Sequence, residues 1–190
     1  MALPREGGPP TPAAVARALL DRVVAYYAEH ADPEDLGAPV PLPERRFVAG
    51  GEPRVVAWDV DLGQVHVAYE RTIRALDPTV PAPAVRAPRT NPANRGNLVR
   101  SVVLEVQVVR PAPGLGQLRT LPTQDELDRH GHALGLDLAH LVRAVSEAAT
   151  GGHLTRENVA EARVDLGDAV TLGPSGKVAG VGLAVTVPLM

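Results

Sequence analysis

The sequence predicts an α+β domain, in which an N-terminal helix and one long helix pack on one face of an antiparallel or mixed β-sheet that ends in a β-hairpin. Apolar residues recur at helical spacing over residues 15–27 and again over 127–148. Over residues 98–110 and 181–189 they instead alternate with the period of a strand. Helices and strands in this order, without regular strand-helix alternation, are typical of the α+β class.

The composition limits what the domain can do. The chain has 190 residues, enough for one domain with its own core, and its lack of Cys excludes disulfides, thiol catalysis and Cys-ligated zinc. A net charge of -3 and 3% aromatic residues give no general attraction to nucleic acid and no stacking platform for it. No apolar run is long enough to cross a bilayer. We expect a soluble protein, made in the cytoplasm, without a cofactor.

The N-terminal helix follows a short leader. Residues 1–10 contain adjacent Gly and Pro pairs and are expected to be flexible, whereas residues 11–190 form the single domain. Thr11 suits the N-cap and Pro12 the first helical position. Asp32-Pro33 disfavours helical geometry, so the helix should end near that point.

The next segment changes from helical to strand periodicity. Short apolar runs occur at Phe47-Val48 and Val55–Trp58, and Val65–Ile73 alternates apolar with polar residues. Turn residues separate these runs at Gly50-Gly51 and Asp61–Gly63. We expect a meander of two or three antiparallel strands.

Residues 74–97 are rich in Pro and have almost no apolar periodicity. A connection of this length inside a domain is usually either functional or disordered. Asp77 is the single acidic residue among the arginines of this segment and its flanks. These arginines are Arg71, Arg74, Arg86, Arg89, Arg95 and Arg100. The segment is therefore either a contact surface or a solvated loop, and the residues alone leave both interpretations open.

A strand over Leu98–Arg110 and a long helix follow. Alternation in the strand places Val102, Leu104, Val106 and Val108 on a core face and leaves the other face mixed. Thr123 and Glu126 form a capping box, and the helix they open continues to Gly151 over about 40 Å, enough to cross a sheet. Gly131 and Gly135 within it indicate either close packing or a weak first half.

The C-terminus is expected to form a hairpin around Gly173-Pro174-Ser175-Gly176. Together with Lys177 this segment resembles the end of a phosphate-binding loop. That motif would require Gly at Thr171, Ser or Thr at Val178, and a following helix where the sequence predicts a strand. We therefore interpret the segment as a hairpin turn.

No arrangement of residues points to catalysis or to a metal. His130, His132 and His140 lack the spacing of four that brings helical ligands together, so we interpret them as histidines of a polar helix face. Asp59 and Asp61 lie beside a turn, where solvated carboxylates are common. The chain has no nucleophilic Ser elbow and no carboxylate pair on a helix face. We expect that the protein is not an enzyme.

Charge is unevenly distributed along the chain. Between residues 119 and 168 nine acidic residues stand against five basic ones, whereas the 74–97 segment is basic. Opposite patches on one chain fit head-to-tail packing of identical subunits, in which one patch meets a different patch of the next copy. Two independently solvated segments explain the same pattern.

The order and character of these elements resemble the tail terminator proteins of long-tailed (siphovirus-type) bacteriophages, in particular those from phages of actinobacteria. The resemblance covers residues 11–189. It rests on the two helices, on Val55–Asp59 in the meander, on the strand Arg100–Arg110 and on the final segment Gly173–Val187. The sequence departs from the family in the Pro-rich and Arg-rich segment 74–97, whose role the resemblance does not supply.

The resemblance implies a structural virion protein at the junction of tail and neck. Such proteins form a homohexameric ring on the major tail tube protein, end its polymerisation and offer a docking surface to the head-tail connector. DNA passes through the lumen of the ring without specific binding, so the arginine-rich segment is expected to lie away from it, because phosphate contacts bind without sequence preference. Candidate interface residues are Arg74, Arg86, Arg89, Arg95, Gly173, Pro174, Ser175, Gly176 and Lys177.

Two alternatives stay open at this point. One is a neck or connector protein of the same particle. The other, of a different class, is a small enzyme or ligand-binding domain with a site near Asp59, Asp61 and His66 at the rim of the meander.

Overall fold

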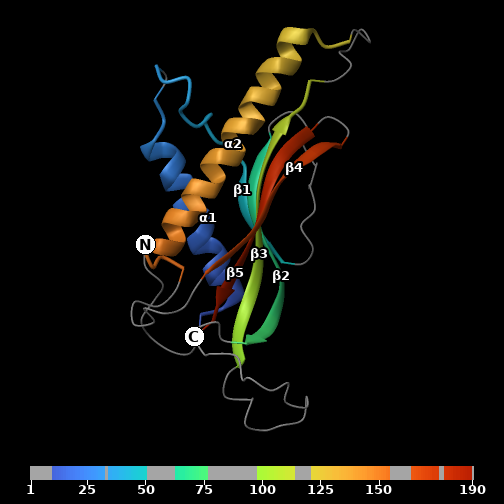
Figure 1. Ribbon diagram of the computed structural model, residues 1–190. Coiled ribbons are helices and arrows are strands. Elements are labelled where there is room, and N and C mark those ends of the chain that lie inside the picture. The colour runs from blue at the N-terminus through green and yellow to red at the C-terminus, as the bar shows by residue number, and fades with distance from the viewer. Residues whose placement is uncertain are drawn as a thin grey trace, which may run out of the picture.

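The computed structural model describes residues 10–32, 34–50, 63–76, 98–113, 121–154, 164–175 and 178–189. These residues form two helices and a five-stranded mixed sheet, with both helices on one face of the sheet (Figure 1). This confirms the predicted α+β class. The helices are α1 (Pro12–Glu29) and α2 (Gln124–Thr150). The strands are β1 (Arg46–Gly50), β2 (Gln64–Leu76), β3 (Leu98–Pro111), β4 (Asp165–Ser175) and β5 (Val178–Pro188).

The strand order in the sheet is β1-β2-β3-β5-β4. The pairs β2–β3, β3–β5 and β5–β4 are antiparallel, and the last pair is the predicted C-terminal hairpin. The predicted antiparallel meander is wrong for β1, because this strand pairs parallel to β2, with Arg46 opposite Val65 and Gly50 opposite Tyr69. A parallel partner cannot be reached through a tight turn, so the chain between β1 and β2 is not a simple hairpin. The predicted turn at Gly50-Gly51 leads into residues outside the described part of the chain. The predicted strand Val55–Trp58 lies outside the described residues.

The boundary of the predicted loop also differs. The backbone of β2 continues to Leu76 and that of β3 begins at Leu98. Arg74 is therefore a strand residue, opposite Arg100 in the antiparallel register, and not a loop residue as predicted. The strand conformation of β2 continues beyond Ile73, where the predicted alternation of apolar and polar residues ended. Residues 77–97 lie outside the described part of the chain.

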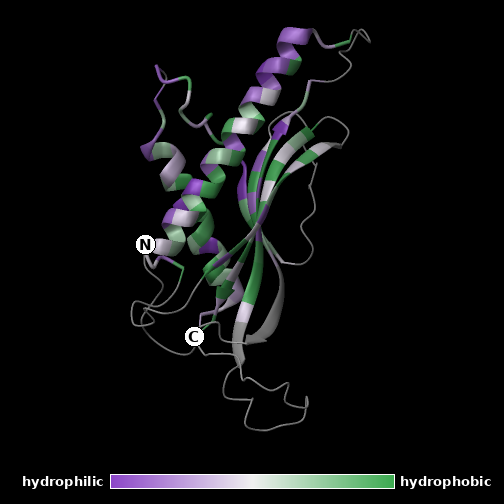
Figure 2. Cartoon of the chain, in the orientation of Figure 1, coloured by the Kyte–Doolittle hydropathy of each residue, from purple (hydrophilic) through white to green (hydrophobic). Residues whose placement is uncertain are grey.

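The core lies between the helices and the sheet. The predicted core face of β3, from Val102 to Val108, is fully buried against both helices. β5 adds Val181, Leu183, Val185 and Val187 to the same layer. The helices contribute Val15, Leu19, Leu20, Val23, Leu141, Val145 and Ala148. Figure 2 shows these apolar stretches along the inner parts of the helices and strands.

Both predicted helix starts are confirmed. The Thr11 side chain accepts a hydrogen bond from the Ala14 amide (3.2 Å), as an N-cap should. At α2 the capping box is complete, because Glu126 N–H donates to Thr123 Oγ1 (3.3 Å) and Thr123 N–H donates to Glu126 Oε2 (2.8 Å). Neither described helix is long and apolar enough to span a membrane.

The two glycines of α2 lie in open surroundings. A Cβ added to Gly131 or Gly135 would meet no atom within 4 Å. Both residues are exposed, and residues 124–129 before them are exposed on every side of the helix. No described residue packs closely against these glycines, which favours the second interpretation, a weak first half of the helix.

Gly131→Ala and Gly135→Ala are each expected to raise the free energy of unfolding by roughly 0.5–1 kcal/mol, because Ala loses less backbone entropy in a helix. Urea unfolding followed by circular dichroism measures the change. A lower stability in both variants would mean that these positions contact another part of the chain.

Candidate functional site

The edge strand of the C-terminal hairpin, β4, is an exposed surface of the described fold. β4 is the last strand of the sheet and pairs with β5, and its outer edge meets no other strand among the described residues. Residues 165–171 are exposed on both faces of the strand. Leu166 and Val170, two of its apolar residues, are 37% and 45% exposed. β4 therefore offers unpaired backbone groups and apolar side chains together.

The structure places part of the predicted interface on this hairpin. Gly173, Pro174 and Ser175 belong to β4, and Ser175 lies opposite Val178 of β5. The predicted turn at residues 173–176 is therefore misplaced, since the strand continues through Ser175 before the chain reverses. The other predicted interface residues, apart from Arg74 in β2, lie outside the described residues. These are Arg86, Arg89, Arg95, Gly176 and Lys177.

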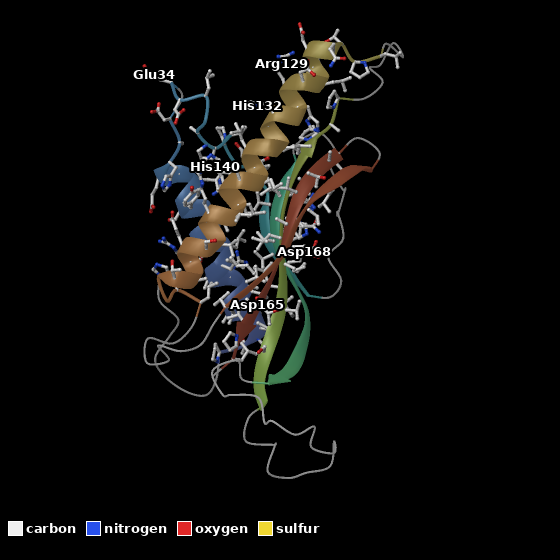
Figure 3. All side chains as sticks on the ribbon, viewed as in Figure 1. Glu34, Arg129, His132, His140, Asp165 and Asp168 are labelled. Atoms are coloured by element: carbon white, nitrogen blue, oxygen red, sulfur yellow. The ribbon has the colours of Figure 1, made fainter. Side chains whose placement is uncertain are left out.

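The two ends of the sheet carry opposite charge. β4 holds Asp165 and Asp168, and no basic residue occurs between residues 164 and 173. Figure 3 labels both aspartates on this strand, and neither forms an ion pair within the described part of the chain. At the other end, Arg46 opens β1 and is exposed. Arg45 precedes it and lies over the Phe47 ring, 5.5 Å from the guanidinium carbon to the ring centroid.

Sequence reasoning missed this opposition between the edges. The adjacent arginines before a short strand and the two aspartates before an apolar run were visible signals. These residues indicate opposite charge at the two edges of a sheet only when both strands are known to be its terminal strands. That knowledge comes from the strand order.

A row of buried polar side chains occupies the helix-free face of the sheet. His66 lies opposite Gln107 of β3 and opposite Phe47 of β1 in the register. The Phe47 and His66 rings stack with centroids 5.1 Å apart and an interplanar angle of 5°. His66 is 1% exposed, and burial lowers its pKa to about 4. His66 therefore has the environment of a packed neutral imidazole, while Asp59 and Asp61, its partners in the alternative site, lie outside the described residues.

A charged cluster ties the helices to the sheet. Arg110 of β3 donates from Nε and Nη2 to the two carboxylate oxygens of Asp137 in α2, at 2.5 and 2.8 Å. The same guanidinium donates to the carbonyls of Pro41 (3.0 Å) and Val40 (3.1 Å). Asp137 is 0% exposed, and burial raises the pKa of its carboxyl while Arg110 opposes that shift. The ion pair holds β3, α2 and the segment after α1 together.

His140 extends this cluster. Its Nε2 donates to the Gly37 carbonyl (2.8 Å), which leaves Nδ1 to accept from the Tyr26 hydroxyl (3.3 Å). The Tyr27 hydroxyl donates to the Asp137 carbonyl (3.1 Å). His140 is 5% exposed, so its interpretation as a polar-face histidine is wrong. Figure 3 shows it between α2 and the N-terminal part of the chain, which covers that side of the helix.

The contacts around His66, and those around the Arg110–Asp137 ion pair and His140, pack elements of the fold against one another. The described residues include no group of three or more His, Asp or Glu side chains arranged to hold a metal ion. No protein-family model matches this sequence, and the curated proteins include none with significant similarity to it. The exposed edge of β4 is therefore the candidate site on which a functional proposal can rest.

Proposed function

We propose that this protein is a tail terminator of a long-tailed bacteriophage. It assembles as a hexameric ring on the last ring of the major tail tube protein, stops polymerisation there and offers its other side to the head-tail connector. It acts in the virion at the junction of tail and neck, and DNA passes through its lumen without specific binding. The observation that carries the proposal is the long edge strand β4, exposed on both faces.

An exposed strand edge is normally a liability. It presents unpaired backbone groups that can join another chain, and monomeric proteins usually shorten, cover or distort such edges. β4 instead spans 11 residues and keeps Leu166 and Val170 open. An edge of this kind is expected in a subunit whose partners pair with it.

The end of a growing tail tube also presents unpaired strand edges. A growing tube offers sheet edges and loops to the next ring, and a cap has to bind them without offering an equivalent surface onward. The hairpin segment Gly173–Lys177 and the segment 74–97 are the proposed contacts with neighbouring subunits or the tube. Arg86, Arg89 and Arg95 are proposed to lie away from the lumen.

Polymerisation of purified tube protein, with and without this chain, tests the proposal. We expect shorter tubes in electron micrographs, each with one blunt end that carries an added ring. Tubes of unchanged length and unmodified ends would contradict termination. If the rings instead bind connector protein while tube length is unaffected, the neck protein is the better assignment.

The hairpin contact can be tested in the same assay. Lys177→Glu is expected to reduce capping by at least about tenfold if this basic residue meets the tube, because reversal of a complementary charge opposes binding. Arg143→Glu, an equal charge change on the exposed side of α2, is the matched control and should cap normally. Equal capping by the two variants would remove the hairpin from the tube interface.

A further inference from the structure

We propose that copies of this chain join head to tail through the two ends of the sheet, with the edge of β4 in one copy pairing with the edge of β1 in the next. This contact rests on the proposed ring and specifies how its subunits meet. Among the described residues the two strands are the terminal members of the sheet order β1-β2-β3-β5-β4. Each copy then uses both edges, and a closed ring leaves neither edge free.

Strand direction permits this pairing. β1 is parallel to β2, and three successive antiparallel pairs lead from β2 through β3 and β5 to β4. β4 is therefore antiparallel to β1 within one copy. Two copies placed side by side in the same orientation bring β4 against β1 as an antiparallel pair, and the helices of both stay on the same face of the joined sheet.

Charge selects β1 as the partner of β4. Asp165 and Asp168 lie on the acidic edge, whereas Arg45 and Arg46 lie at the start of β1. Opposite charges on neighbouring strands stabilise pairing and like charges oppose it. A symmetric β4–β4 pair would place only carboxylates along its seam and would leave both β1 edges unused. The charges therefore favour a heterologous contact, which closes into a ring when the rotation between successive copies completes a circle.

Burial of apolar surface supports the same partner. Leu166 pairs with Val185 and thus lies on the helix side of β4, where it is exposed. Val48 lies on the helix side of β1 and is partly buried against the core, beside α1. Joining the edges would place Leu166 beside this apolar border and continue the core from one copy into the next.

Charge reversal tests the contact in the full-length protein. Asp165→Arg with Asp168→Arg, and separately Arg45→Asp with Arg46→Asp, should each weaken self-association at least about tenfold in sedimentation experiments. Mixing the two variants should restore assembly, because alternating copies make every β4–β1 contact complementary. A chain that carries all four changes should also assemble. Asp21→Arg with Glu147→Arg, at exposed helix positions, is the matched control and should assemble like the unmodified protein.

Cross-linking provides an independent measurement, since the chain has no Cys. In the antiparallel register that brings Arg46 opposite Asp168, Ala49 lies opposite Asp165. With a short bismaleimide, the Ala49→Cys, Asp165→Cys double variant should therefore give a ladder of products up to the hexamer, while Ala49→Cys, Asp165→Cys and Thr171→Cys as single variants should stay uncrosslinked. Dimers of Thr171→Cys alone would indicate β4–β4 pairing and overturn the proposal. Monomers in every sample, or charge variants that assemble without mixing, would also overturn it.

These outcomes separate the contact from the function. Rings that form normally in the charge-reversed variants and still cap tubes would remove the β4–β1 contact and leave termination intact. Complementary mixing together with unchanged tube length would establish the contact and remove termination.

Discussion

Asp137→Ala is expected to lower the free energy of unfolding by about 3–5 kcal/mol, the largest effect of any single change considered. The Asp137 carboxylate is fully buried and receives two hydrogen bonds from Arg110. Its removal leaves the guanidinium of Arg110 in a largely buried position with only the carbonyls of Val40 and Pro41 as acceptors. Urea unfolding of the variant and of the unmodified protein measures the difference.

A double variant distinguishes loss of the pair from loss of volume. Arg110→Met with Asp137→Leu removes both charges and keeps apolar bulk, so it should be more stable than Asp137→Ala by at least about 1 kcal/mol. A loss below about 1 kcal/mol in Asp137→Ala would mean that water reaches and replaces the ion pair.

Acidification is expected to destabilise the protein through His66. Its folded pKa is lowered to about 4 by burial, whereas an unfolded chain should bind the proton near the ordinary value of 6.5. The unfolded state therefore binds more protons between these values, and stability should fall as the pH drops from about 6.5 to about 4. Below about pH 4, where the effect is complete, the expected loss in the free energy of unfolding is roughly 3 kcal/mol.

His66→Gln should flatten that pH dependence, because Gln has no proton to gain. His132→Gln, a change of the same kind at an exposed position of α2, is the control and should keep the slope of the unmodified protein. Unfolding free energies measured across this pH range decide the matter. An equal slope in His66→Gln and the unmodified protein would assign the pH dependence to other groups.

Local signals predicted much of this fold. The N-caps at Thr11 and Thr123 and the core face of β3 depend on residues a few positions apart, and the structure confirms them. The direction of β1 was predicted wrongly, because a period of two reports which face is buried and not which way the partner runs. The turn of the hairpin was misplaced for a related reason, since Gly and Pro mark a turn without fixing its position.

The inner clusters were harder to predict because they depend on distant segments. Arg110 and Asp137 lie on different elements, and His140 is buried only because α1 and the segment around Gly37 cover that side of α2. The candidate edge was predicted in part. The hairpin was expected at the C-terminus, but its exposure on both faces and the opposite charge of β1 follow from the strand order. Ring formation, tube capping and the role of residues 74–97 stay predictions.

Tail length in a phage that lacks the gene for this chain is the most direct measurement of the proposed function. Electron micrographs should show tails longer than normal and of variable length, and supplying the unmodified protein should restore a single length. The Asp165→Arg, Asp168→Arg variant should fail to do so, while its mixture with Arg45→Asp, Arg46→Asp should succeed. Tails of normal, uniform length in the absence of the protein would contradict tail termination.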